Sequence, residues 1–455
     1  MTREKKKKAA TDFTKGPVWK NILSQAVPLM IAQLVHLLYN IVDRIYIGHM
    51  DEGSSLALTG VGLTFPVVTL IMAFAALFGV GGVPLFSIAR GRGDGERAGL
   101  ILGNSCTLLL LSSGFLTLGC LVFLRPILFA FGASEDSFPY ASAYLRIYLA
   151  GAVFSMLSTG LNSYINAQGF PRVGMMSIVL GAAANILLDP LMIFVFRMGV
   201  AGAALATVLS QAISAGWILR FLIRKENPVP LRKENMRLRR EIVREISRLG
   251  TSNFIMQGTN CLVQIACNAT LQAWGGDLYV GIMTVANSVR EVFQLPSGGI
   301  TTGSQPVISF NYGAGEHERA RAGIRFNTVI GFAYTALAWM LVFFFPKTWI
   351  GIFSPDPQLA EQGAEMLRIY FFGFVFMSFQ MAGQSAFQAL GDARHAIFFS
   401  LLRKAIIVTP LTLLLPGTGL GVRGVFLAEP ISNVIGGVAC YATMYMTAYR
   451  RLRKT

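Results

Sequence analysis

Charged residues are scarce in this chain of 455 residues. They make up 14% of the sequence, whereas 53% of the residues are hydrophobic. A soluble globular fold of this length needs more charge to cover its surface, so the composition excludes that class. It predicts an integral membrane protein instead, because a membrane-spanning helix needs about 20 mostly apolar residues and runs of that kind recur along the chain.

Cysteine and histidine are also few. The five cysteines lie in apolar runs and show no CxxC spacing, and the four histidines are widely dispersed. The cysteines therefore predict buried, reduced packing residues, and no metal site is expected. The apolar runs contain no clustered nucleophile and base, so we expect neither an intramembrane enzyme nor a cofactor. The first run is too long for a signal peptide and should remain as a span.

Charged or Gly/Pro-rich breaks divide the apolar sequence into twelve segments. We therefore predict an all-α integral membrane fold of twelve transmembrane helices, some tilted because they exceed one membrane thickness. The predicted spans lie near residues 21–48, 56–84, 100–131, 138–168, 174–197, 200–224, 243–274, 279–305, 322–352, 358–390, 396–416 and 420–447.

The net charge of +16 is explained by topology rather than by nucleic acid. Basic residues gather in the tails 1–20 and 448–455, between Arg220 and Arg248, and near Arg90 and Arg319. An even number of spans puts all these segments on one side, which the positive-inside rule assigns to the cytoplasm. We expect a multi-pass plasma-membrane protein with both termini cytoplasmic. The run Lys5–Lys8 fits this topology signal or a contact with anionic lipid.

A displacement of 222 residues matches the chain to itself. Leu145–Tyr148 recurs as Leu367–Tyr370, and Pro84–Gly99 is identical to its counterpart at seven positions. The repeat predicts two pseudo-symmetric six-helix lobes, 21–224 and 243–447, joined by a linker over 225–242. Two such lobes around a central site are the usual construction of secondary transporters. The stretch Glu234–Arg248 suits either an amphipathic surface helix or a solvated linker.

Polar residues of the first half lie on helical stripes inside predicted spans. Gln33, His36, Asn40 and Asp43 share one face of the first span. A carboxylate at that depth usually marks an ion or proton route, although Asp43 also suits a residue paired near the helix end. Further oxygens for a proton or Na⁺ come from the fourth and fifth spans, at Ser155, Ser158, Asn162, Asn166, Asn185 and Asp189.

The stripes of the second half consist of amides. They suit hydrogen bonds to substrate or between helices, and we predict substrate contacts at Gln33, His36, Asn40, Gln257, Asn260, Gln264, Gln384 and Gln388. Glu429, the repeat counterpart of Thr207, is a candidate second proton site. Its alternative is an ion pair with Arg403, Lys404 or Arg423. The pairs Arg290-Glu291 and Arg403-Lys404 are predicted to be ion-pairing or interfacial residues rather than binding groups.

Four motifs together resemble the multidrug and toxic compound extrusion (MATE) family. They are Leu38–Asp43, Asn185–Pro190, Gly202–Thr207, and Gly303–Pro306 with the following Phe310–Ala314. The resemblance, over about residues 20–447, implies a monomeric antiporter in membrane lipid. It implies export of amphipathic or cationic drugs by alternating access in exchange for H⁺ or Na⁺. The ion-coupling residues that it implies are Asp43, Tyr144, Asn162, Asn185, Asp189 and Thr207.

Two departures from the family pattern matter. The seventh span lacks an acidic residue, which places the chain in the bacterial-type branch that relies on its amino lobe. Arg44 beside Asp43 leaves the choice between H⁺ and Na⁺ open.

Competing classes fit the sequence less well. A lipid-linked oligosaccharide flippase of the same superfamily needs a strongly cationic cavity, whereas the stripes here carry amides and acids. A major-facilitator transporter is matched only loosely by the loop Ala89–Arg97. A passive channel would conduct without ion coupling, which a reconstituted flux assay distinguishes.

Overall fold

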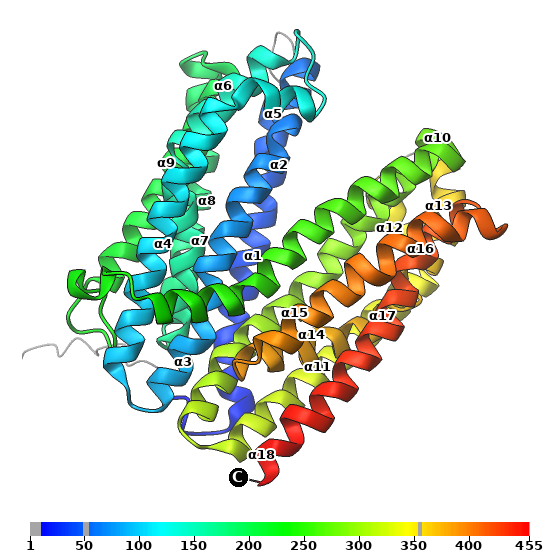
Figure 1. Ribbon diagram of the computed structural model, residues 1–455. Helices are drawn as coiled ribbons and strands as arrows, with labels where there is room; N and C mark the ends of the chain where they lie inside the picture. Colours follow the sequence, from blue (N-terminus) through cyan, green and yellow to red (C-terminus); the bar gives the residue numbers. More distant parts are fainter. Residues whose placement is uncertain (1–10, 49–53, 354–356, 455) are drawn as a thin grey trace, which may run out of the picture.

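The computed structural model describes residues 11–48, 54–353 and 357–454. Within these ranges it describes every side chain except those of residues 40–41, 43–45, 47–48, 54–59, 261, 277, 353, 357–358 and 453–454. The described chain folds into two helical bundles, as Figure 1 shows: an amino lobe drawn in blue to green and a carboxyl lobe drawn in green to red. The predicted all-α membrane fold is confirmed.

The described part of the amino lobe contains nine α-helices. A 3₁₀ turn, Val80–Gly82, precedes α3, and a π-helical turn, Leu191–Val195, extends α8. The helices are α1 (Val18–Gly48), α2 (Ser54–Phe78), α3 (Val83–Gly91), α4 (Gly95–Val122), α5 (Leu124–Ala130), α6 (Phe138–Ala150), α7 (Ala152–Ala167), α8 (Pro171–Pro190) and α9 (Gly199–Leu222).

The carboxyl lobe begins with a long broken helix, α10. Short 3₁₀ or π-helical turns occupy Leu402–Val408, Leu415–Thr418 and Tyr445–Tyr449. The helices are α10 (Arg240–Gly313), α11 (His317–Phe344), α12 (Pro346–Phe353), α13 (Pro357–Phe371), α14 (Phe374–Ala389), α15 (Ala393–Leu401), α16 (Thr409–Leu414), α17 (Val422–Met444) and α18 (Arg450–Lys454).

The helices account for the predicted spans. Among the described residues, nine helical segments are long and apolar enough to cross a membrane, and the pair α6 and α7, bent by 55°, forms a tenth. Gly276, at φ 68° and ψ −166°, breaks α10 into two arms, 240–275 and 277–313. These arms carry the amide stripe and Arg290, which lower their hydropathy, and they supply the remaining two predicted spans.

The internal repeat is visible in the backbone. Four helices of the amino lobe begin 222 residues before their counterparts: Gly95 and His317, Leu124 and Pro346, Ala152 and Phe374, and Pro171 and Ala393. Turn glycines with positive φ follow the same displacement, at Gly93 and Gly315, Gly169 and Gly391, and Gly199 and Gly421. Only glycine adopts these φ values readily, so the duplicated turns explain why the glycines recur.

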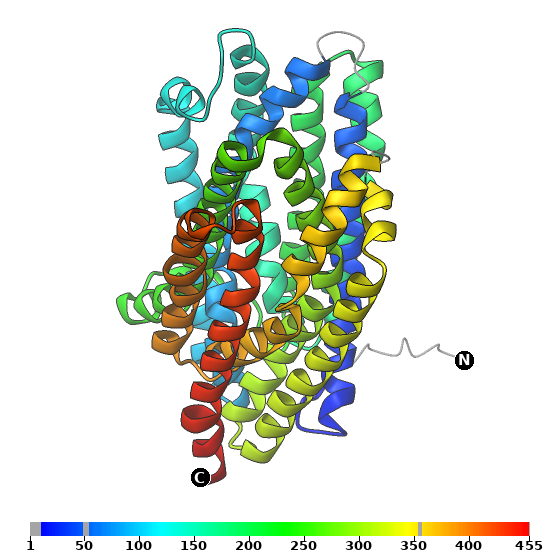
Figure 2. The ribbon, with the colours of Figure 1, turned by 90° about the vertical axis from the view of Figure 1, so that its right-hand side faces the viewer.

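The lobes meet through close backbone contacts near α3 and diverge toward the top of Figure 1. A Cβ on Gly91 would overlap the Phe310 carbonyl, and a Cβ on Gly313 would overlap the Ile88 carbonyl. The two contacts are related by the repeat, since each residue of one pair lies 222 positions from a residue of the other. Figure 2 places α18 and the start of α1 at this same lower end.

The linker is neither a surface helix nor a free loop. Residues Lys233–Met236 form a 3₁₀ turn, and α10 begins only at Arg240. The side chain of Asn104 in α4 donates to the carbonyls of Asn235 and Arg237 at 3.2 and 3.3 Å. The first turn of α10 also packs inward, with Ile242 in the core of the amino lobe. The stretch 234–248 therefore combines parts of the two predicted alternatives: from Arg240 it is an amphipathic helix, but the apolar face of that helix packs on the amino lobe.

Candidate functional site

A buried polar pair lies on α8 of the amino lobe. Asn185 donates from Nδ2 to Oδ1 of Asp189 at 3.2 Å, because residues four apart share one helix face. Both side chains are almost completely buried. Among the described residues, Oδ1 of Asn185 is a buried acceptor with no hydrogen-bond partner. This arrangement presents oxygen ligands, which suit a small hard cation.

Two other predicted members lie on α6 and α9 of the same lobe. Helix α9 packs along α8 with Ser210 beside Gly181, which puts Thr207 at the level of Asn185 because the helices run in opposite directions. Tyr144 of α6 is buried and stacks on Tyr148, with ring centroids 6.1 Å apart. Asn185 and Asp189 thus contact each other, whereas the predicted ion-coupling roles of Thr207 and Tyr144 stay predictions.

Asn162 lies elsewhere. Its Oδ1 and that of Asn166 face Gly174, near the start of α8. Gly174 lies eleven residues before Asn185, which is about 16 Å along a helix axis. The resemblance placed Asn162 in the ion site, but the structure separates it from Asn185, and its role stays a prediction.

The stripe on α1 is described only in part. Asn40 and Asp43 lie outside the described side chains, so their predicted roles stay predictions. Gln33 lines a cavity between the lobes. His36 lies on the exposed face of the helix within 3.5 Å of the Tyr39 hydroxyl, and the two rings meet edge to face.

A cavity of about 410 Å³ separates α1 from the two arms of α10. Gln33 forms one wall, and Gln264, Asn287, Arg290, Glu291 and Gln294 form the other. It thus lies at the junction of the repeats, where transporters of this architecture bind substrate.

A second cavity, of about 170 Å³, continues into the carboxyl lobe. Gln264, Asn287 and Arg290 line both cavities, and Asn260, Tyr370, Lys404 and Glu429 line only the inner one. The polar lining is therefore continuous from the space between the lobes to the interior of one lobe.

Glu429 lies at the centre of an ion-pair cluster in the inner cavity. Its carboxylate accepts two hydrogen bonds from Lys404 Nζ at 3.0 Å and one from Arg290 at 2.9 Å. Arg403 lies 3.6 Å away. The predicted ion-pairing alternative is thus realised with Lys404 and Arg403, whereas Arg423 pairs with Glu365 instead. Its role as a second proton site stays a prediction.

The predicted substrate amides divide into two groups. Gln384 and Gln388 on α14 donate to Ser400, Ser252 and Asn253, which ties α14 to α10 and α15. These bonds correspond to the interhelical alternative. Asn260 and Gln264 instead line the inner cavity, and Gln257 is half-buried on the same arm of α10.

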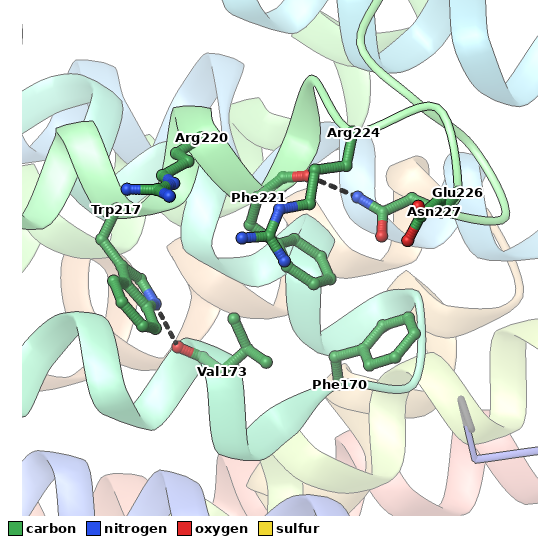
Figure 3. A pocket seen from close by; sticks show the side chains of 8 residues that line it. All are labelled: Phe170, Val173, Trp217, Arg220, Phe221, Arg224, Glu226 and Asn227. Carbon is green, nitrogen blue, oxygen red and sulfur yellow. Dashed lines mark hydrogen bonds between the residues drawn. The ribbon is translucent and has the colours of Figure 1, made fainter. Parts of the chain in front are cut away.

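A groove on the amino lobe, about 330 Å³ in volume, lies apart from this path (Figure 3). Trp217 donates to the Val173 carbonyl at 3.2 Å, Phe170 packs edge to face on Phe221, and Arg220 and Arg224 flank them. Trp and Arg gather at the membrane–water interface. The groove therefore marks the membrane surface on the basic side of the molecule.

Sequence reasoning undervalued Arg290 and Lys404, which it assigned to pairing or interfacial positions. Both pair with Glu429, and both also line the inner cavity. The available signal was their position: each is a basic residue inside an apolar run, where charge usually marks a functional path. Tyr370 and Asn287 gave no signal, because their bond, 2.8 Å from the Tyr370 hydroxyl to Asn287 Oδ1, joins helices far apart in sequence.

A duplicated all-helical membrane bundle with polar cavities at the junction of its repeats has the architecture of a secondary transporter. The MatE family model matches residues 28–191 and 254–414. These ranges cover more than half of the chain, which therefore belongs to the MatE family.

Similar proteins cover nearly the whole chain. The multidrug export protein MepA of Staphylococcus saprophyticus is 25% identical over 440 residues, or 95% of each chain. A multidrug resistance MATE family transporter of the MOP superfamily, solved in an outward-facing conformation, is 25% identical with a TM-score of 0.91 and covers 98% of this chain and 100% of that one. A MOP superfamily transporter from Pyrococcus furiosus, described with reversed polarity of its binding pocket, is 26% identical with a TM-score of 0.90 at the same coverage.

Proposed function

We propose that this protein is a secondary active exporter of small amphipathic molecules, drugs or organic cations, working by alternating access in the cell membrane. The observation that carries the proposal is the polar cavity between two duplicated lobes that meet at one end. Rocking of the lobes closes the open end and opens this seam, which exposes the cavity to each side in turn. Relatives named as multidrug exporters support an exporter rather than an enzyme.

The coupling ion, H⁺ or Na⁺, binds in the amino lobe. Asp189 and Asn185 form a buried oxygen site on α8, with Thr207 at the same level. The family resemblance adds Asp43. A carboxylate that is alternately neutralised by the ion and re-exposed couples ion entry to export, because the bare charge is costly in the membrane.

The flippase alternative is not favoured. The cavity between the lobes is lined mainly by amides, and its one arginine, Arg290, is adjacent to Glu291.

The basic side of the molecule, carrying the linker and both ends of the described chain, faces the cytoplasm in this proposal.

Efflux from proteoliposomes tests the function. Ethidium is loaded, and H⁺ and Na⁺ gradients are imposed separately. Wild-type protein should export ethidium faster with one gradient than with neither, and Asp189→Asn should abolish that stimulation. Asp136→Asn, at an exposed loop position, is the matched control and should transport normally. Equal efflux under all gradients would refute secondary active transport.

A further inference from the structure

The ion-pair cluster of the inner cavity holds more positive than negative charge. Lys404, Arg290 and Arg403 surround the single carboxylate of Glu429, whose side chain is 7% exposed. With all four groups ionised, the cluster therefore carries two positive charges in excess. Counting the exposed Glu291 on the neighbouring cavity wall still leaves an excess of one.

Neutral groups occupy the remaining contacts of the cations. Arg403 donates to Oδ1 of Asn433 at 2.9 Å, and the Arg290 guanidinium lies over the Tyr370 ring at 5.6 Å. A ring face and an amide oxygen attract a cation but do not cancel its charge. A buried cation without a counter-charge is costly, and in a membrane it usually faces a pathway and finds a partner there.

Arg290 is placed to meet such a partner. It is the most exposed member of the cluster, at 24%, whereas Lys404 is 4% exposed. It lines both cavities, so a molecule in the space between the lobes reaches the cluster through it. The arginine fork binds carboxylate and phosphate oxygens in pairs.

We propose that the inner cavity binds the anionic group, a carboxylate or a phosphate, of a small-molecule cargo whose body occupies the cavity between the lobes. Asn260, Gln264 and Asn287 add uncharged hydrogen-bonding groups around the anion. This inference rests on the proposed export of amphipathic molecules, and it adds cargo with an anionic group to the organic cations named there. The two lobes therefore differ in their buried charge. The carboxyl lobe has an excess of cations around Glu429. In the amino lobe the repeat counterpart of Glu429 is the uncharged Thr207, and the buried charged residue of α8 is the acid Asp189.

Two probes of nearly the same shape and opposite charge test the site. Benzoate and benzamidinium are titrated into the purified full-length protein in neutral detergent at neutral pH, and binding is measured by calorimetry. Benzoate should bind at least about tenfold more tightly than benzamidinium, a difference of about 1.4 kcal/mol. Equal binding, or preference for benzamidinium, would overturn the proposal.

Variants expected to change benzoate affinity in opposite directions distinguish an effect on the site from misfolding. Arg290→Gln should weaken benzoate binding by at least about tenfold, which corresponds to loss of one charge-assisted hydrogen bond. Arg290→Lys should recover part of it. Glu429→Gln, which removes the competing carboxylate, should strengthen binding, a result that a damaged fold cannot give. Arg125→Gln, at an exposed pair with Glu135 on the amino lobe, should leave binding unchanged.

A second titration distinguishes a soluble anion from the headgroup of a lipid. Phosphatidylglycerol is titrated against phosphatidylcholine in the same detergent. Binding of benzoate assigns the site to soluble anions, and Arg290-dependent binding of phosphatidylglycerol alone assigns it to a lipid headgroup instead of a cargo. No Arg290-dependent binding of either excludes an anion site. These assays need no gradient, so they fail or succeed independently of ethidium export.

Discussion

Glu429 shows how one side chain links stability to function. It is the only carboxylate among the described residues that line the inner cavity. Three cations, Arg290, Arg403 and Lys404, lie around it. Removing one partner of a buried ion pair costs more than the pair itself contributes, since the other charge remains buried without compensation.

Glu429→Gln should therefore destabilise the protein by about 3–5 kcal/mol. Thermal unfolding in detergent measures the effect, and Glu365→Gln, at an exposed pair with Arg423, is the control and should change stability little. The pH profile of transport separates the two roles of Glu429. An unchanged profile with lowered stability indicates structural pairing, whereas a changed profile with normal stability indicates a proton site.

Helix α10 joins the lobes through a glycine contact. A Cβ on Gly250 would overlap the carbonyl of Leu77 at the end of α2, and Gly81 lies against Gly250 on the same face. No side chain fits between these backbones. The contact lies on the basic side of the molecule, so it belongs to the seam that opens in the proposed rocking of the lobes.

Gly250→Val should open this seam. Overpacking of this kind destabilises a structure by about 1–3 kcal/mol. Here it destabilises the state in which the seam is closed. The midpoint temperature of thermal unfolding and the rate of ethidium efflux should both decrease. Gly258→Val, on the same arm of α10 with open space around it, introduces the same residue into the same helix. Equal effects of the two substitutions would contradict a role for close packing.

The segment before α1 forms a second tie across the seam. Arg319 of α11 donates to the carbonyls of Phe13 and Gly16 at 2.8 and 3.0 Å. The backbone amide of Thr11 donates to Gly169 of the amino lobe at 3.1 Å, and Phe13 is buried. The segment thus bonds to both lobes on the basic side.

Arg319→Gln should release this segment. Hydrogen exchange of residues 11–17 should accelerate, because exchange follows local opening and the carbonyls lose their donor. Arg325→Gln, at an exposed position on the same helix, should leave exchange unchanged. Unaltered protection in Arg319→Gln would show that Phe13 packing alone holds the segment.

Elements related by sequence repetition were predictable, and contacts between distant helices were not. The 222-residue displacement predicts the lobes, and the structure reproduces it in the helix starts at Gly95 and His317. The cluster around Glu429 joins Arg290 and Lys404, residues far apart in sequence, so periodicity carries no information on their distance. A stripe also does not say what it faces: Gln388 bonds to other helices, whereas Gln264 lines a cavity.

The molecule as a whole consists of two lobes, related by an internal repeat, that are joined on the basic side. The amino lobe presents a buried acid, Asp189, and the carboxyl lobe presents an excess of cations. In the proposed mechanism the ion and the cargo bind to different lobes, and the seam transmits the binding of one to the other. This requires that the lobes move as bodies while their own helices stay packed.

Distances between spin labels on the two lobes report whether the lobes rock. One pair, Asp136→Cys and Thr418→Cys, reports the end away from the termini, and another, Arg92→Cys and Arg394→Cys, reports the basic side. All four positions are exposed, and native cysteines are replaced. When an H⁺ or Na⁺ gradient is imposed with ethidium in proteoliposomes, the first distance should shorten as the second lengthens. Distances that stay fixed, or that change in the same direction, would contradict alternating access by rocking lobes.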